Sequence, residues 1–341
     1  MEDLYLANCD YYSKKDNCKK IENVKSLLIQ GEPLDEPPLI SIAVPTFKRV
    51  STLKGTIESA INQKGSHRYN IIVVDNNPER NDETEVFMRE YATSYPTVLY
   101  YKNEQNIGMG GNWCRCMELA DGKWVILIHD DDLLIEDYLN EIEPCLSDNI
   151  DGIFVMSSVF EDGKPLPRIQ NPNQMRLFKK SIKDQYHFPS LGPSGNILKK
   201  STVIELGCFD KDIFAPDAFF SKMAYYGNVY TTNKKLIYYR VGINESTKLS
   251  AMDKICYQNH FHRIQTFEKL GIPKFIIKRL LLYSDIIFEK PFQTFWNKDF
   301  KYSSMPQYTA KEAFISKLFY KPVDFFLKVS RKIFRKTIII N

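Results

Sequence analysis

Four apolar runs separated by helical patterns constrain the fold of this chain more than any other feature. The runs cover residues 39–44, 70–75, 98–101 and 123–128. Runs without polar alternation are typical of strands that are buried on both faces of a parallel sheet. The alternation of strand and helix therefore predicts an α/β fold, with a doubly wound, mostly parallel sheet flanked by helices.

Polar clusters follow these predicted strands or open the helices after them. The clusters cover residues 46–49, 75–77, 106–112 and 130–132. Ligands of doubly wound sheets bind beyond the carboxyl ends of the strands. Four clusters at one edge of the sheet therefore predict a nucleotide site.

The last cluster consists of Asp130, Asp131 and Asp132. Three crowded carboxylates repel one another, and a divalent cation would relieve that repulsion. Mg²⁺ and Mn²⁺ take oxygen ligands, often one or two carboxylates together with substrate phosphates. The alternative is a solvated turn with an N-cap acid. We expect the preceding His129 to be packed at the strand end and not to bind the cation.

Two further clusters hold candidate ligand contacts. Asp75 ends the second strand, where a carboxylate accepts hydrogen bonds from a ribose or a base. The glycine-rich stretch that includes Asn106 and Gly108 is expected to be a loop whose backbone approaches a ligand closely. The stretch is not G-x-G-x-x-G and follows the third strand, which argues against a nicotinamide cofactor.

The stretches 42–49, 72–77, 106–108 and 120–132 together resemble the family 2 glycosyltransferases with the GT-A fold. Their order and spacing match over residues 40–135, and a weaker likeness continues to Arg240. The resemblance implies an inverting transferase that takes a sugar from a nucleoside-diphosphate donor, with a UDP-sugar favoured. The implied acceptor is a hydroxyl of a glycan or lipid-linked glycan, as in bacterial surface polysaccharide synthesis.

The resemblance also implies roles for single residues. Thr46 and Asp75 correspond to the pair that holds the base and ribose, and Asp130 faces the ribose. Asp131 is the favoured ligand of Mn²⁺ or Mg²⁺, and Asp132 is the alternative because the triplet leaves the register open.

A catalytic base is implied at Asp217, although Pro216 stands where the family usually has Glu. We expect the positive end of the helix to lower the pKa of Asp217, and an N-cap is the alternative role. Arg240 is a candidate contact of the donor diphosphate, with a surface ion pair as the alternative.

The chain divides into three predicted parts. Residues 1–38 are an N-terminal appendage with a short helix over 21–28 and a proline-rich linker. Residues 39–250 are the catalytic domain, with 39–135 as the nucleotide-sugar half and 136–250 as the acceptor half. Within the second half, 161–196 reads as a long loop. Residues 251–341 are expected to be helical to the end, with a basic amphipathic tail.

Charge and cysteine content indicate which partners and which cell compartment the protein has. The net charge is +4, but residues 311–341 carry eight Lys or Arg and two Asp or Glu. Basic character is thus confined to the tail, which argues against nucleic acid as a partner and favours an anionic membrane surface. The alternative is a tail helix packed on the domain.

Seven scattered cysteines without a C-x-x-C pair predict neither a disulfide framework nor a zinc site. The sequence contains no apolar run of transmembrane length, and its acidic start does not resemble a secretion signal. We therefore expect a cytoplasmic protein, with the basic tail as a means of attachment to the inner face of the cell membrane.

Two other functions fit parts of this pattern. A sugar-phosphate nucleotidylyltransferase has a related sheet and acidic metal ligands, but it needs a glycine-rich basic loop after the first strand. Residues 45–49 supply the basic side chains without glycines. A catalytically inactive carbohydrate-binding relative is the other alternative, and Pro216 is the feature that favours it.

Overall fold

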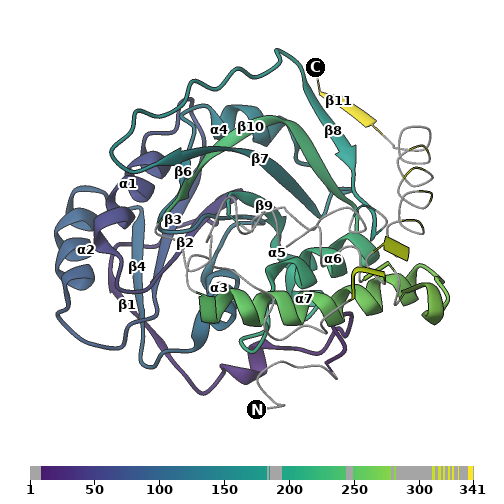
Figure 1. Cartoon of the computed structure of the whole chain (residues 1–341). Helices are drawn as coiled ribbons and strands as arrows, with labels where there is room; N and C mark the ends of the chain where they lie inside the picture. Colours follow the sequence, from purple (N-terminus) through teal and green to yellow (C-terminus); the bar gives the residue numbers. More distant parts are fainter. Residues whose placement is uncertain are drawn as a thin grey trace.

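A computed structural model gives the fold of the chain (Figure 1). The residues that it describes are 9–182, 184, 194–242, 249–277, 280, 281, 309–311, 314, 315, 318, 322, 325, 329 and 337–340.

An 11-stranded sheet forms the centre of the described part of the chain. In spatial order its strands are β1 (Ser26–Gln30), β4 (Val98–Asn103), β3 (Tyr69–Asp75), β2 (Ile40–Thr46), β5 (Trp124–Leu127), β9 (Asn196–Lys199), β7 (Gly152–Glu161), β10 (Val229–Val241), β8 (Met175–Lys179) and β11 (Thr337–Ile340), while β6 (Leu133–Leu134) pairs with β10. Strands β4, β3, β2 and β5 are parallel, and β9 runs antiparallel between β5 and β7. The predicted α/β fold with a mostly parallel sheet is confirmed.

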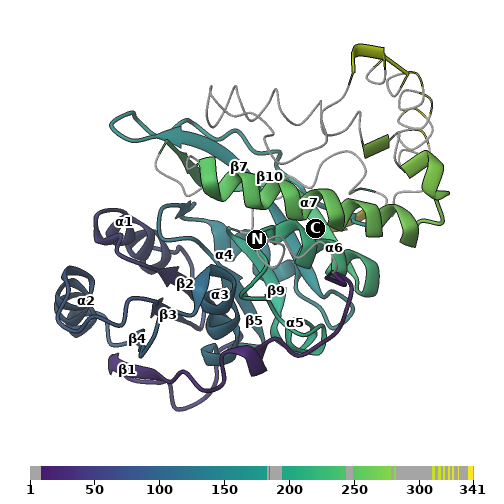
Figure 2. The ribbon, with the colours of Figure 1, turned by 60° about the horizontal axis from the view of Figure 1, so that its bottom comes forward.

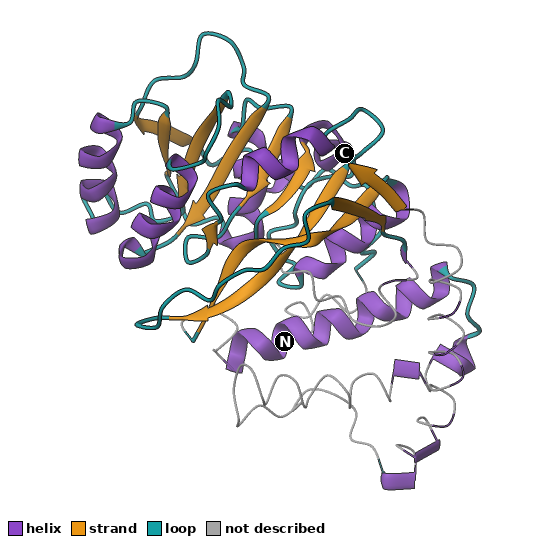
Figure 3. Ribbon diagram, turned by 90° about the horizontal axis from the view of Figure 1, so that it is seen from above, coloured by secondary structure: helices purple, strands orange, loops and turns teal. Residues whose placement is uncertain are grey.

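Helices cover both faces of the sheet (Figure 3). One face packs against α1 (Val50–Ile61), α2 (Glu83–Ser94) and α4 (Tyr138–Ile142), and the other against α3 (Gly108–Leu119), α5 (Lys200–Glu205) and α6 (Pro216–Tyr226). Successive side chains of a strand point to opposite faces, so both faces of β2 are apolar and buried. Ile42 belongs to the core beneath α1, and Ala43 to the core beneath α3.

The N-terminal residues contradict the predicted helix over 21–28. They form a short 3-10 turn, η2 (Cys18–Lys20), followed by strand β1, which pairs antiparallel with β4 at the sheet edge (Figure 2). Leu27 and Leu28 are each 41% exposed, as expected for neighbours on an edge strand with little covering. Pairing with β1 satisfies the outward backbone N–H and C=O groups of β4. A helix at this place would leave those groups to water. The domain boundaries themselves stay a prediction.

The acceptor half is more regular than its sequence indicates. Strand β8 lies inside the predicted loop 161–196, and β10 begins at Val229, well before the predicted strand at 236–240. Residues 185–193 of that loop lie outside the described residues. A further 3-10 turn, η3 (Glu143–Cys145), follows α4.

The C-terminal region begins with the predicted helix, α7 (Leu249–Lys269), which packs against α6 (Figure 2). The chain is not helical to the end, because β11 pairs antiparallel with β8. Between them, the described residues from 310 to 329 are helical, and Phe314, Leu318 and Phe325 expose 58–70% of their surface. Among the described residues, no helix has the length and apolar character needed to cross a bilayer.

Candidate functional site

The acid triplet lies just beyond the end of β5, and all three aspartates are buried. Thr46, at the end of neighbouring β2, donates from Oγ1 to Oδ2 of Asp130 at 2.7 Å. The guanidinium of Arg49 donates to Oδ2 of Asp131 at 2.7 Å and to Oδ1 of Asp130 at 3.4 Å. Arg49 was not singled out from the sequence, although it belongs to the polar cluster that follows the first strand.

Arg240 approaches the triplet from strand β10. Its backbone N–H donates to Oδ1 of Asp132 at 2.8 Å, and its Nε donates to the carbonyl oxygen of Asp131 at 2.7 Å. The guanidinium also pairs with Asp162 and lies 4.6 Å from the ring centre of Phe160. The predicted site residues Thr46, Arg240 and the three aspartates therefore form one network.

Three buried atoms at this site have no hydrogen-bond partner among the described residues: Nε2 of His129, Oδ1 of Asp131 and Oδ2 of Asp132. Candidate ligand atoms of these same side chains all lie within 4.8 Å of one another. Buried polar atoms are nearly always paired, so this convergence fits a divalent cation. The sequence did not decide between Asp131 and Asp132 as the cation ligand, and both contribute an atom to this group. His129 stacks on Trp113 as a packed ring would, yet it also faces the cation position.

Burial raises the proton affinity of Asp130 and Asp132. Desolvation, together with the charge of Asp131, raises the pKa of Asp130 to about 6, although Thr46 and Arg49 oppose the shift. Desolvation and the charge of Asp131 also raise the pKa of Asp132. Both effects reflect negative charge held together in a region with little water, and a bound cation would offset them.

Asp75 is fully buried in a separate network at the end of β3. Its Oδ2 accepts hydrogen bonds from the Tyr100 hydroxyl at 2.8 Å and the Lys102 ammonium at 2.9 Å, while its Oδ1 accepts from the Asn77 N–H. Desolvation nevertheless raises the pKa of Asp75. Thr46 and Asp75 are register partners on adjacent strands, but the hydrogen bonds of their side chains run to different groups.

The glycine-rich stretch is not the predicted loop, because Gly108 to Gly111 form the first turn of α3. A close backbone approach does occur there, but to the protein itself. A Cβ on Gly110 would lie 2.2 Å from the carbonyl oxygen of Asp210. Asn106 accepts hydrogen bonds through Oδ1 from Asn76 and from the N–H of Gly108, which has a φ of 77°.

Asp217 lies in the first turn of α6, and in the described part of the chain no hydrogen bond or ion pair joins it to the acid triplet. Its Oδ2 accepts a hydrogen bond from Nδ2 of Asn259 on α7 at 3.5 Å. Burial raises the pKa of Asp217 to about 8, although Asn259 and Arg263 oppose the shift. The predicted lowering of this pKa is therefore wrong, because desolvation beneath α7 outweighs the helix terminus.

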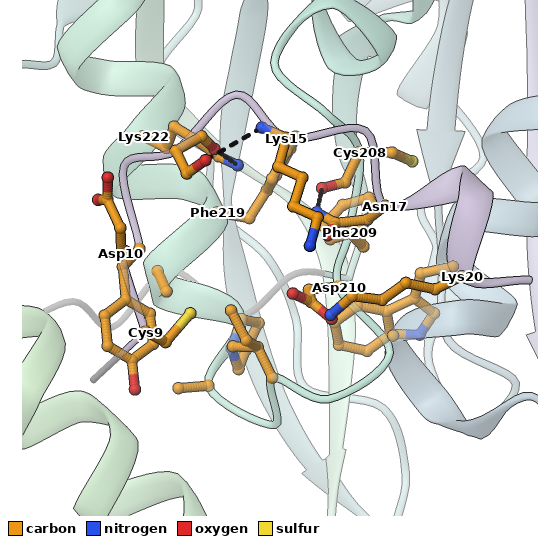
Figure 4. Close-up of a pocket in the computed structure, with 18 residues that line it drawn as sticks. Cys9, Asp10, Lys15, Asn17, Lys20, Cys208, Phe209, Asp210, Phe219 and Lys222 are labelled. Carbon is orange, nitrogen blue, oxygen red and sulfur yellow. Dashed lines mark hydrogen bonds and ion pairs between the residues drawn. The ribbon is translucent and has the colours of Figure 1, made fainter. Parts of the chain in front are cut away.

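A cavity of about 300 Å³ lies beside the start of α6 (Figure 4). Its walls come from the N-terminal segment 9–20, the turn 208–213 and α6, with Trp113 of α3 at one side. Lys20 pairs there with Asp210 at 2.6 Å, and Lys222 donates to the carbonyl oxygen of Ser13 at 3.0 Å. No sequence pattern indicates that residues before 38 line this cavity, although several of residues 9–20 do.

Residues 41–207 match the family model described as Glycosyl transferase family 2. An uncharacterized glycosyltransferase of Methanocaldococcus jannaschii is 26% identical over 182 residues, which cover 52% of this chain and 61% of that protein. The GalNAc(5)-diNAcBac-PP-undecaprenol beta-1,3-glucosyltransferase of Campylobacter jejuni is 24% identical over 215 residues, covering 63% and 68%. The chain spans about three fifths of the length of the M. jannaschii protein and of an uncharacterized protein of Mycobacterium tuberculosis.

Two solved structures share the fold. One is residues 1–349 of TarS from S. aureus in complex with UDP-GlcNAc, with a TM-score of 0.55 and 13% identity over 81% of this chain and 79% of that chain. The other is the mannosyltransferase PcManGT from Pyrobaculum calidifontis in complex with GDP-Man and Mn²⁺, with a TM-score of 0.50 and 15% identity over 91% and 88%. At these identities the likeness establishes the GT-A type fold alone.

Proposed function

Because the chain belongs to glycosyl transferase family 2, we propose that it is an inverting enzyme of surface polysaccharide synthesis. It moves a sugar from a nucleoside-diphosphate donor, with a UDP-sugar favoured, to a hydroxyl of a glycan or lipid-linked glycan. The observation that carries this proposal is that candidate ligand atoms of His129, Asp131 and Asp132 lie within 4.8 Å of one another at the end of β5. Each of these side chains also has a buried atom without a hydrogen-bond partner among the described residues. The activity named for the Campylobacter jejuni relative supports the proposal.

The donor is assigned to the strand ends around the triplet. Thr46 and Asp130 share a hydrogen bond at the edge where nucleotides bind in such sheets. Asp75, Asn106 and Gly108 stay candidate contacts of the base and ribose. Asp75 would contact the donor while it also accepts hydrogen bonds from Tyr100 and Lys102.

His129, Asp131 and Asp132 would hold Mn²⁺ or Mg²⁺. When bound, such a cation acts as a Lewis acid toward the leaving diphosphate. The imidazole nitrogen favours Mn²⁺ over Mg²⁺, which prefers oxygen ligands. Arg240, whose backbone and Nε already contact the two aspartates, is placed to orient them and to meet the diphosphate through its guanidinium.

Asp217 is assigned the role of general base. Its carboxylate takes the proton of the acceptor hydroxyl while that oxygen forms a bond to the anomeric carbon. The bond from the anomeric carbon to the diphosphate breaks, and the nucleoside diphosphate leaves with the electron pair. One displacement inverts the anomeric centre and needs no covalent enzyme intermediate. A pKa near 8 gives Asp217 more affinity for this proton than an ordinary aspartate has.

The basic tail is proposed to lie on the inner face of the cell membrane, where a lipid-linked acceptor would be met. Phe314, Leu318 and Phe325 are helical positions with exposed apolar side chains, and basic residues lie between and after them. This combination favours interfacial binding to anionic lipid. The enzyme itself is expected in the cytoplasm.

A panel of sugar nucleotides incubated with the protein and Mn²⁺ tests the proposal, with release of nucleoside diphosphate as the readout. We expect slow hydrolysis of one donor class, and thermal stabilisation by the matching nucleoside diphosphate that needs Mn²⁺. Formation of a sugar nucleotide from a sugar phosphate and a nucleoside triphosphate would instead establish a nucleotidylyltransferase. Binding of glycan without donor binding or turnover would establish an inactive relative.

A further inference from the structure

We propose that Cys18, Cys114 and Cys208 form a zinc site that fastens the N-terminal segment to the catalytic domain. The three residues are separated by about ninety positions each in the sequence, yet their sulfur atoms all lie within 4.8 Å of one another. All three are free thiols, with Cys114 and Cys208 buried and Cys18 partly exposed. This cluster lies outside the acid triplet and uses none of its residues.

The spacing of the sulfur atoms suits a shared metal ion. Sulfur atoms bound to one tetrahedral Zn²⁺ at about 2.3 Å lie roughly 3.8 Å apart. The sulfur atoms of Cys18 and Cys114 are 3.1 Å apart, somewhat closer than that spacing, and the sulfur of Cys208 lies within 4.8 Å of both. A disulfide needs an S–S distance of about 2.05 Å, and it would leave the third thiol without a role.

Glu118 is the candidate for a fourth ligand of the proposed site. It lies four residues after Cys114 on α3, and residues at this spacing share one face of a helix. Its carboxylate is outside the group of sulfur atoms that lie within 4.8 Å of one another, and Nε of Arg115 donates to its Oε2 at 2.9 Å. Its side chain would have to move toward the sulfurs to complete the four-coordinate shell that structural zinc sites have.

Metal binding at this cluster would release protons. A thiolate, and not a thiol, is the form that binds metal. Zinc affinity should therefore increase with pH as the three thiols ionise.

The backbone around Cys208 is specialised for this contact. Cys208 has a φ of 59°, in the left-handed region that side chains other than glycine seldom adopt. The preceding Gly207 also has a positive φ, and a Cβ there would lie 2.1 Å from the carbonyl oxygen of Lys15. Asn17 bonds to this turn twice, through its N–H to the Gly207 carbonyl and through its side chain to the Cys208 carbonyl (Figure 4).

The N-terminal segment that the metal would hold also builds one wall of the cavity beside α6. Lys15, Asn17 and Lys20 line that cavity from the same stretch that carries Cys18. Zinc would thus stabilise the wall without contacting the reacting groups. The inference does not depend on the proposed transferase activity, because a metal-bound clamp is detectable without turnover.

Cobalt and zinc binding to the full-length protein, reduced and stripped of metal, tests the inference. Co²⁺ should give the absorption band of thiolate-to-metal charge transfer, with one ion per chain. Zn²⁺ at about a hundred times its Kd should abolish that band and raise the melting temperature by roughly 4 °C. Cys18→Ser should lose both effects while remaining folded, since Cys18 is partly exposed.

Two variants make the result specific. Cys9→Ser alters a partly exposed cysteine of the same segment and should keep the band and the shift. Asp131→Asn should also keep them, which separates this site from the acid triplet. Absence of the band in the wild type, or an equal band in Cys18→Ser, would overturn the proposal. So would a Cys18–Cys114 disulfide in protein purified without reductant, detected by mass and by thiol counting.

Discussion

Asp130 and Asp132 of the acid triplet and Asp217 are carboxylates with raised pKa values, but their surroundings differ. The triplet has Arg49, Thr46 and Arg240 bonded to it from two other strands or their ends. Asp217 accepts a hydrogen bond from Asn259 at 3.5 Å, and burial raises its pKa to about 8. The first environment favours binding of positive charge, and the second favours holding a proton. The same functional group is therefore fitted to two different tasks.

The largest effect is expected from Asp131→Asn. This change removes one negative ligand from the cation position and one partner of Arg49, so charge on the leaving group loses several kcal/mol of stabilisation. We expect kcat/KM for donor turnover to fall by about 10³-fold or more, measured as nucleotide release with Mn²⁺. Asp121→Asn, at an exposed acid before β5, is the control and should stay near wild type. Near-normal turnover by Asp131→Asn would remove this residue from the metal site.

A somewhat smaller loss is expected from Asp217→Asn, which keeps the shape of the side chain but cannot take a proton. General base catalysis typically contributes about 10²- to 10³-fold or somewhat more, and kcat for transfer to an acceptor should fall by that factor. The Kd of the nucleoside diphosphate, measured by calorimetry, should not change. Glu205→Gln, at an exposed acid of α5, is the control. Equal losses of nucleotide affinity and turnover would assign Asp217 a structural role instead.

His129→Gln should weaken Mn²⁺ binding by about tenfold to a hundredfold. The loss should be greater for Mn²⁺ than for Mg²⁺, because nitrogen ligands favour the transition metal. Titration of free Mn²⁺ by electron paramagnetic resonance measures the affinity directly. Trp113→Phe keeps an aromatic ring beside His129 and should leave the affinity nearly unchanged. If His129→Gln bound both ions as the wild type does, the histidine would be a packing residue only.

The smallest effect is a dependence on pH. A base must be ionised before the reaction, and the pKa of Asp217 is raised to about 8. Its ionised fraction therefore falls as pH decreases below 8, and kcat at pH 7 should be roughly fivefold lower than at pH 8. The rate should level off above that range, and Asp217→Asn should lose the dependence. A wild-type rate that is flat from pH 6 to pH 9 would contradict the assignment.

The sequence predicted the fold and the triplet because both depend on short stretches of chain. β2, β3, β4 and β5 are uninterrupted apolar runs, and the polar residues follow them directly. Parallel strands then bring those residues to one edge without further information. Strand β1 was missed because Leu27 and Leu28 are adjacent and give no period-2 pattern, and the free edge of β4 decides its structure.

Other properties depend on contacts between distant residues. The pKa of Asp217 is set by the burial that packing of α7, some forty residues later, produces. Gly110 is small because Asp210 approaches it, a hundred positions away. Cys18, Cys114 and Cys208 have no common motif, and their proximity follows from the docking of η2 on α3. Patterns within short windows carry no signal for any of these.

Strand β11 covers an edge of the sheet that would otherwise be open. It covers β8, whose other neighbour is β10, and thus occupies a row of backbone N–H and C=O groups that faces outward. An uncovered strand edge is a template for pairing between molecules. Since β11 is itself the outermost strand on this side of the sheet and has four residues, the edge that it leaves open is short, which limits such pairing.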